Sequence, residues 1–221
     1  FLHLYAVDLA RAPDGGWWVM ADRTQAPSGA GYALQNRLVI SRAFPAPFHN
    51  LPVTNLSEFF QGFQNSLAGM SPAGTESPLC VLLTPGRFNE TYFEHVFLAR
   101  YLGLPLVEGQ DLTVRDDTVY LKTLQGLRRV HAIYRRLDDG FCDPLELRAD
   151  SVLGIPGLLG AVRAGKVLMA NALGSGVLES AALFGFLPEI SKKLLGSPLA
   201  MPSVASSSAV AATSTSPSTR T

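Results

Sequence analysis

Residues 7–29 read VDLARAPDGGWWVMADRTQAPSG, and this stretch decides the fold. Two apolar runs, His3 to Arg11 and Trp17 to Arg23, flank Pro13-Asp14-Gly15-Gly16. An Asp-Gly pair between two β-prone runs is the strongest short-range signal for a β-hairpin. After a turn at Ala26-Pro27-Ser28-Gly29, the apolar spacing predicts a helix that runs to about Phe44. The sequence therefore predicts a hairpin that leads into a helix N-terminus.

A hairpin followed by a helix start brings together groups that hold ions of opposite sign. Carboxylates on the strands bind a cation, and the unpaired N–H groups of the helix start attract an anion. Asp8 is the candidate cation ligand on the first strand. We expect Ser28 to cap the helix, and Ser28 and Gly29 together are candidates for binding a substrate carboxylate. A plain helix cap is the alternative interpretation of the same two residues.

These residues carry a family resemblance. ATP-grasp ligases, among them D-alanine:D-alanine ligase and glutathione synthetase, place an Asp on a strand, then a hairpin, a Glu-x-Asn sequence and a Pro-Gly or Ser-Gly turn that opens a helix. Here Asp8 stands thirteen residues before Ala21, and Ala21-Asp22-Arg23 occupies the Glu-x-Asn position. The chain resembles the circularly permuted ATP-grasp type 2 family, formerly domains of unknown function and similar to glutathionylspermidine synthase, over roughly residues 1–200, including 22–37, 87–95 and 134–139.

The resemblance implies an ATP-dependent carboxylate-amine ligase that uses ATP and Mg²⁺. In the family, the Asp, Glu and Asn hold Mg²⁺, which needs hard oxygen ligands. Here only Asp8 keeps such a ligand. Side chains alternate along a strand, so Asp22 replaces the missing Glu only if a bulge shifts the register. Asp8 and Asp22 are therefore the candidate metal ligands.

The composition restricts the functional classes. The 221 residues carry no net charge, which argues against a nucleic-acid partner. No run approaches the roughly 18 apolar residues of a membrane span. The chain starts at Phe1 without Met or a signal peptide, so we expect a fragment of a longer protein. Two isolated cysteines, Cys80 and Cys142, favour a reducing cytoplasm.

The sequence predicts an α/β protein with a permuted order of parts. A Pro, Gly, Ser and Thr linker at Ser71 to Pro78 follows a second helix at Leu56 to Met70, and it marks a boundary. We expect four regions: residues 1–50, the C-terminal part of the ATP-grasp fold; 51–77, helix and linker; 78–197, a Rossmann-like substrate domain; and 198–221, a disordered Ser/Thr/Ala-rich tail.

The pattern after residue 78 is typical of a parallel sheet. Strand, helix and strand follow one another at Cys80–Thr84, Asn89–Leu102 and Leu104–Val107, which is a βαβ unit. Beyond it we expect a hairpin at Leu112–Leu121, strands at Val130–Leu137 and Val167–Ala170, and helices at Pro156–Ala164 and Val177–Leu195.

Three further residues are site candidates. Arg135 and Arg136 lie at the C-terminal end of a predicted strand, where open α/β sheets bind ligands, and we name both as catalytic candidates. Alternation lets only one of them face a cleft, and we favour Arg135. Asn171 precedes Gly174-Ser175-Gly176 and is a substrate-binding candidate, although such a Gly-x-Gly is more often a tight turn. The expected ligand is an acidic small molecule or peptide.

Three functional classes remain open. The resemblance implies the ligase described above. Ala21 and Arg23 favour instead a catalytically degenerate relative that acts as a binding or scaffolding subunit. A nucleotide-dependent oxidoreductase is weakly supported, because no Gly-x-Gly-x-x-Gly follows the first strand of the second half. In the permuted order, the lysines and lid that grip ATP would lie downstream of Leu195, so we expect this fragment alone not to bind ATP and Mg²⁺.

Overall fold

The structure is a computed structural model that describes residues 2–74 and 77–203. The described chain divides into two compact units. The larger unit contains residues 2–4 and Gln25–Gly174, and the smaller unit contains Tyr5–Thr24 and residues 175–203. The chain therefore passes between the units after Leu4, after Thr24 and after Gly174. The predicted linker at Ser71 to Pro78 does not separate these units.

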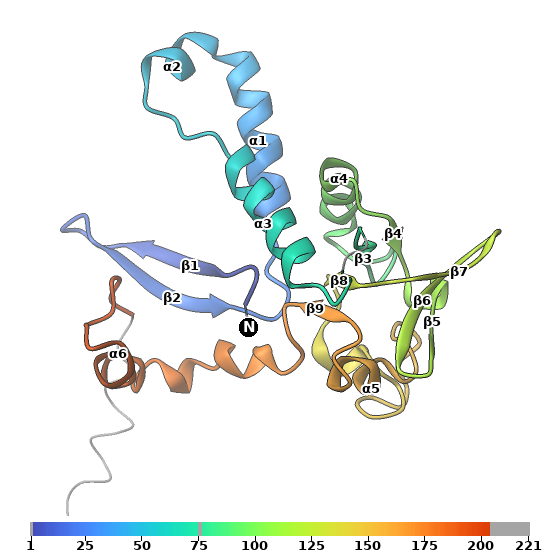
Figure 1. Cartoon of the computed structure of the whole chain (residues 1–221). Helices are drawn as coiled ribbons and strands as arrows, with labels where there is room; N and C mark the ends of the chain where they lie inside the picture. The colour runs from blue at the N-terminus through green and yellow to red at the C-terminus, as the bar shows by residue number, and fades with distance from the viewer. Residues whose placement is uncertain (1, 75–76, 204–221) are drawn as a thin grey trace, which may run out of the picture. The chain divides into compact units, whose positions relative to one another are not determined.

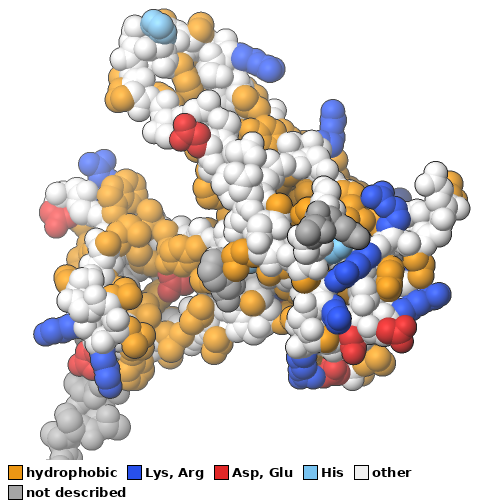
Figure 2. Space-filling model, viewed as in Figure 1, with side chains coloured by type: hydrophobic (Ala, Val, Ile, Leu, Met, Phe, Trp, Pro, Cys, Tyr) orange, Lys and Arg blue, Asp and Glu red, His pale blue; other side chains and the backbone are white. Residues whose placement is uncertain are grey.

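The predicted hairpin is the core of the smaller unit. Strand β1 (Ala6–Arg11) pairs antiparallel with β2 (Trp17–Arg23), and Gly15 in the connecting turn has a φ of 88°. A left-handed φ of this kind favours glycine, which confirms the Asp-Gly signal. A bulge falls between Asp8 and Leu9. Hydrophobic side chains cover much of the visible face of this hairpin (Figure 2).

The chain after the larger unit differs from its prediction. The expected single helix at Val177–Leu195 is wrong: two 3-10 turns, η3 (Ser175–Glu179) and η4 (Ala181–Leu183), precede helix α6 (Leu187–Leu195). Pro188 stands in the first turn of α6, where its missing N–H costs nothing, so the helix starts there. The prediction that the tail is disordered from residue 198 is wrong for residues 198–203, because Val19 bonds to Pro202 and bridges to Ser203. Residues 204–221 lie outside the described residues.

A four-stranded parallel sheet forms the centre of the larger unit (Figure 1). Its strand order is β4-β3-β8-β9, and every neighbouring pair is parallel. The predicted βαβ unit is confirmed, with α4 (Tyr92–Leu102) ended by Gly103 at a φ of 65°. The strands are β3 (Cys80–Leu83), β4 (Leu106–Val107), β8 (Ala132–Arg135) and β9 (Leu168–Ala170).

Both faces of this sheet are buried, as in parallel sheets generally. Because side chains alternate along each strand, neighbouring residues contribute to different cores. One core contains Val81, Leu83, Ile133 and Met169, packed with helix α5 (Leu158–Arg163). The opposite core contains Leu82, Tyr134 and Ala170, packed with α4 and with α3 (Ser57–Met70). The α/β class predicted from the sequence is confirmed.

Helices α1 and α3 contribute to the core on one face of this sheet. Helix α1 (Ala30–Ala43) follows the prediction, and α3 buries Phe60, Phe63 and Leu67 in the core that Leu34 of α1 also joins. This shared core also contains Leu82 of β3, and the four predicted regions stay a prediction. A short helix, α2 (Pro45–Asn50), lies where the sequence predicted only a helix end.

A second sheet completes the larger unit. The predicted hairpin is confirmed as β5 (Leu112–Arg115) and β6 (Thr118–Thr123), with Asp116 and Asp117 at positive φ in the turn. The sequence missed the third strand, β7 (Gly126–Arg129), which pairs with β6. Within the two described ranges, no helix combines the length and apolar character needed to cross a bilayer.

Candidate functional site

The hairpin face that carries the first metal candidate is occupied by an ion pair. Asp8 lies directly opposite Ala21, and Arg23 shares their face, as strand alternation predicts. Arg23 donates through Nη2 to Asp8 Oδ2 at 2.6 Å and through Nε at 3.2 Å. The hydrogen bond to Asp8 raises the pKa of Arg23. Both side chains are about half exposed, so solvent screens this pair.

The second metal candidate points away from the first. Asp22 pairs with Val7 and so lies on the opposite face of the hairpin from Asp8, because the bulge follows Asp8 and leaves this register unchanged. Asp22 is 8% exposed and accepts a hydrogen bond from the Tyr5 hydroxyl at 2.6 Å. Burial and this bond raise the pKa of Tyr5. Among the described residues, no group of three His, Cys, Asp or Glu side chains is placed to hold a metal ion.

The start of α1 is capped by Glu94, which is distant in sequence and carries no local capping signal. The prediction that Ser28 caps this helix is wrong, because Gly29 is at the N-cap and no side chain of the cap bonds the first turn. Instead, Glu94 Oε1 accepts hydrogen bonds from the N–H groups of Gly29 and Gly31, both at 2.8 Å. A carboxylate is the group that a helix N-terminus favours. An anionic ligand at Ser28-Gly29 would therefore have to displace Glu94.

Arg136 neutralises this capping carboxylate inside the protein. Its Nη2 lies 3.5 Å from Glu94 Oε2, and both side chains are buried. Its Nη1 donates to the carbonyl of Pro27 at 2.5 Å, next to Ser28. The structure thus brings Arg136 and the Ser28-Gly29 turn together, as predicted for one of the two arginines, with Glu94 as the third member.

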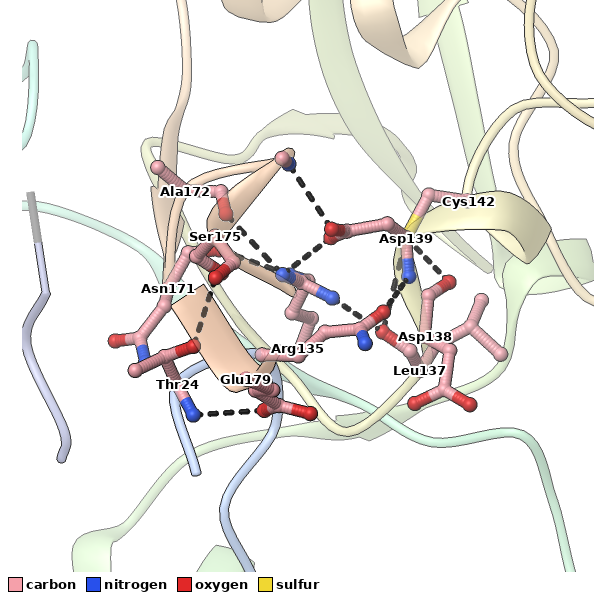
Figure 3. Close-up of polar contacts among 12 residues, drawn as sticks. Thr24, Arg135, Leu137, Asp138, Asp139, Cys142, Asn171, Ala172, Ser175 and Glu179 are labelled. Atoms are coloured by element: carbon pink, nitrogen blue, oxygen red, sulfur yellow. Dashed lines mark hydrogen bonds and ion pairs between the residues drawn. The ribbon is translucent and has the colours of Figure 1, made fainter. Parts of the chain in front are cut away.

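Arg135 is directed instead toward the carboxyl ends of β8 and β9 (Figure 3). It is fully buried, and its guanidinium donates to the carbonyls of Asn171, Leu137 and Ala172 at 2.8, 2.7 and 3.2 Å. Its Nη2 also lies 2.5 Å from Asp139 Oδ1. The planar donors of a guanidinium are suited to binding a carboxylate, and here these carbonyls and Asp139 accept from them. Substrate binding by either arginine stays a prediction.

Asp139 and Asn171 extend this cluster to the three ends of the larger unit. The N–H of Asp139 donates to Gln25 Oε1 at 2.5 Å, and its Oδ2 accepts from the N–H of Gly174 at 3.0 Å. Asn171 Nδ2 donates to the carbonyl of Leu4 at 2.6 Å, and its Oδ1 accepts from the N–H of Leu4 at 3.0 Å. The chain leaves this unit after Leu4, returns to it at Gln25 and leaves it again after Gly174.

The smaller unit joins two of its own chain ends in the same way. The Thr24 hydroxyl donates to the carbonyl of Ser175 at 2.7 Å, and the N–H of Thr24 donates to Glu179 Oε1 at 2.7 Å (Figure 3). These contacts tie β2 to η3. They hold in place the first residues of the predicted Gly-x-Gly turn.

A buried histidine of α4 bonds to the residue that follows β3 and to the residue that precedes α4. His95 is 1% exposed, and its Nδ1 and Nε2 bond to the hydroxyls of Thr84 at 2.8 Å and Thr91 at 3.0 Å. Burial, with a smaller contribution from Arg136, lowers the pKa of His95 to about 4. The imidazole is therefore neutral at pH 7 and serves to connect the two threonines. Both cysteines are free thiols, and burial raises the pKa of Cys142 to about 12.

Comparison with known proteins identifies the family. The model described as circularly permuted ATP-grasp type 2 matches residues 1–216, which extends past residue 200, where the sequence resemblance was expected to end. An uncharacterized protein of Mycobacterium tuberculosis, Rv2567, is 45% identical over 194 residues, covering 88% of this chain and 22% of that protein.

Two further relatives have similar sequence identity to this chain and similar coverage of it. The uncharacterized protein sll0335 of Synechocystis sp. is 42% identical over 188 residues, covering 85% of this chain and 39% of its own length. The uncharacterized protein Rv2411c of Mycobacterium tuberculosis is 41% identical over 187 residues, covering 85% and 34%. The chain thus spans well under half the length of these curated relatives. Because the family model covers nearly all of it, the chain belongs to the circularly permuted ATP-grasp type 2 family.

Proposed function

We propose that this chain is part of an ATP-dependent carboxylate-amine ligase whose nucleotide and metal site is not completed by these residues alone. The family match over residues 1–216 is the observation that carries this proposal. In such a reaction, ATP phosphorylates a carboxylate and an amine attacks the acyl phosphate. ATP and Mg²⁺ belong to the whole protein under this proposal.

The acidic residues of the hairpin do not fit a magnesium ion by themselves. Mg²⁺ requires near-octahedral oxygen coordination and is bound through carboxylates, substrate phosphates and water. Asp8 is engaged by Arg23, and Asp22 is on the opposite face of the hairpin. Arg23 also brings a positive charge to the face where the cation would lie. No catalytic step is therefore assigned to a metal on these residues.

The Asp8–Arg23 ion pair favours a second candidate function. A relative that has lost the metal site and serves as a binding or scaffolding subunit would keep the hairpin while replacing metal ligands with a self-neutralising pair. Both candidates share the family fold, and they differ in whether restoring oxygen ligands restores nucleotide binding.

The larger unit is proposed as the substrate-binding part, with the Rossmann-like arrangement expected from the sequence. Its parallel strand order β4-β3-β8-β9 supports this. The chain runs from β3 to its neighbour β4 on one side, whereas the later strand β8 pairs with β3 on the other side, so the strand order reverses at β3. Ligands of such sheets bind where the strand order reverses, beyond the carboxyl ends of the strands. An acidic small molecule or peptide is the proposed ligand, and it would have to replace Glu94 as the partner of Arg136, which directly follows β8.

A double substitution in the whole protein tests these alternatives. Ala21→Glu with Arg23→Asn adds two oxygen ligands to the face of Asp8. If the metal site is degenerate, Mg²⁺-dependent nucleotide binding measured by calorimetry should become at least about tenfold tighter, which corresponds to about 1.4 kcal/mol. The matched control, Val7→Glu, puts a carboxylate on the opposite face and should leave binding unchanged. Weaker binding in the double variant would mean that Arg23 itself contacts a phosphate.

A further inference from the structure

The smaller unit contains a cavity of about 180 Å³ beside the buried Asp22. Apolar side chains from three segments line it: Val19 of β2, Phe184 after η4 together with Leu187 at the start of α6, and Met201. The polar groups in its lining include the side chains of Tyr5 and Asp22. A mostly apolar hollow with a few convergent polar groups is the usual form of a small-molecule site.

Among the described residues, no cationic side chain forms an ion pair with the carboxylate in this cavity. Asp22 is 8% exposed, and Tyr5 donates to its Oδ1 at 2.6 Å. Across residues 2–74 and 77–203, Oδ2 accepts no hydrogen bond, and Asp22 takes part in no ion pair with Lys, Arg or His. Oδ2 is not among the described buried side-chain atoms that lack a partner, so it stays accessible as an acceptor beside the apolar lining. Arg23, the nearest cation in sequence, lies on the other face of the hairpin with Asp8.

We propose that this cavity binds a small organic ammonium with a compact apolar body. Its N–H groups would donate to Asp22 Oδ2, and its hydrocarbon part would lie against Val19, Phe184 and Leu187. A cavity of about 150 Å³ accepts benzene, so about 180 Å³ suits an amine with roughly five to seven carbons. A metal ion fits less well, because Mg²⁺ and Ca²⁺ need several oxygen ligands and this lining is mostly apolar.

The Tyr5 hydroxyl gives this site its orientation. Because it bonds to Oδ1, it fixes the carboxylate and leaves Oδ2 as the acceptor for the ligand. A charge-assisted N–H···O bond is stronger than its neutral counterpart, which would select an amine over an alcohol of the same shape. The site lies within the smaller unit and is independent of the proposed ligase activity.

Binding of benzylammonium, compared with benzyl alcohol, tests the proposal. Titration calorimetry or amide chemical shifts of the intact chain at pH 7 should show benzylammonium binding at least about tenfold tighter than the alcohol. Asp22→Asn should remove this preference. The matched control Asp8→Asn changes a carboxylate on the opposite face of the same hairpin and should leave the preference intact.

A second variant keeps the test decisive if Asp22→Asn fails to fold. Ala200 lines the cavity at an exposed position, so Ala200→Leu should fill it and abolish binding of benzylammonium without changing Asp22. Equal affinity for the amine and the alcohol in the unmodified chain would overturn the proposal. So would amine binding that survives both Asp22→Asn and Ala200→Leu.

Discussion

Arg135 Nη2 and Asp139 Oδ1 lie 2.5 Å apart at the carboxyl end of β8, and the arginine side chain of this pair is completely buried. The same two residues bond the backbone around Asn171 and Gly174, as well as Gln25. The pair therefore fixes the segments through which the chain leaves the larger unit. Its main effect is on the stability and order of that unit.

Arg135→Met should lower the free energy of unfolding by about 3–5 kcal/mol, because it removes the ion pair with Asp139 and the donors to three carbonyls. Arg135→Lys keeps the charge but not the planar fork, and it should cost about 1–3 kcal/mol. Urea unfolding measures both. The exposed control Arg128→Met should change stability by less than about 0.5 kcal/mol. A loss of similar size at Arg128 and Arg135 would contradict this account.

Glu94→Ala should destabilise the larger unit by about 3–5 kcal/mol, because Arg136 is then buried without its carboxylate and the N–H groups of Gly29 and Gly31 lose their acceptor. Glu94→Gln keeps an acceptor for the helix and should cost less. Glu90, exposed just before α4, provides the control as Glu90→Ala. Amide hydrogen exchange of Gly31 locates the effect: unchanged protection in Glu94→Ala would mean that the carboxylate does not cap α1.

The low pKa of His95 predicts a loss of stability in acid. The unfolded state takes up the proton near pH 6.5 and the folded state near pH 4, so His95 favours the folded state above pH 6.5. As the pH falls from 6.5 through 4, this contribution is lost, and its size is on the order of 2–3 kcal/mol. Urea unfolding at several pH values should show a shallower slope in His95→Gln. The exposed control His49→Gln should keep the original slope.

The Asp8–Arg23 pair should add little to stability. Both side chains are about half exposed, and pairs of this kind contribute about 1 kcal/mol or less. A double-mutant cycle of Asp8→Asn and Arg23→Gln measures the coupling by urea unfolding at low and high salt. A coupling well above that value, or one insensitive to salt, would show that this pair is structural.

The sequence predicts local structure well where local chemistry decides it. Asp14-Gly15 set the hairpin, and Gly103 ended α4 at a positive φ, so both elements were predicted with nearly correct bounds. Strand β7 was missed because only four residues, including two arginines, carry its pattern. The helix expected at Val177–Leu195 is broken because Pro188 favours a new helix start.

The candidate site depended on contacts that no local pattern reveals. Glu94 reaches Gly29 across 65 positions of sequence, and Asp139 reaches Gln25 across 114. Ser28 was chosen as the cap because its residue type favours that role, but Glu94 supplies the charge instead. Asp8 and Arg23 share a face and Asp22 does not, as the alternation of side chains along a strand predicts.

Titration calorimetry of this chain with ATP in the presence of Mg²⁺ tests the central claim most directly. Because Asp8 is paired with Arg23 and Asp22 faces away, the account predicts no binding with a dissociation constant tighter than about 1 mM, or about 4 kcal/mol of binding free energy. A dissociation constant in the micromolar range, lost when Mg²⁺ is chelated, would show that these residues form a complete nucleotide and metal site and would contradict the account.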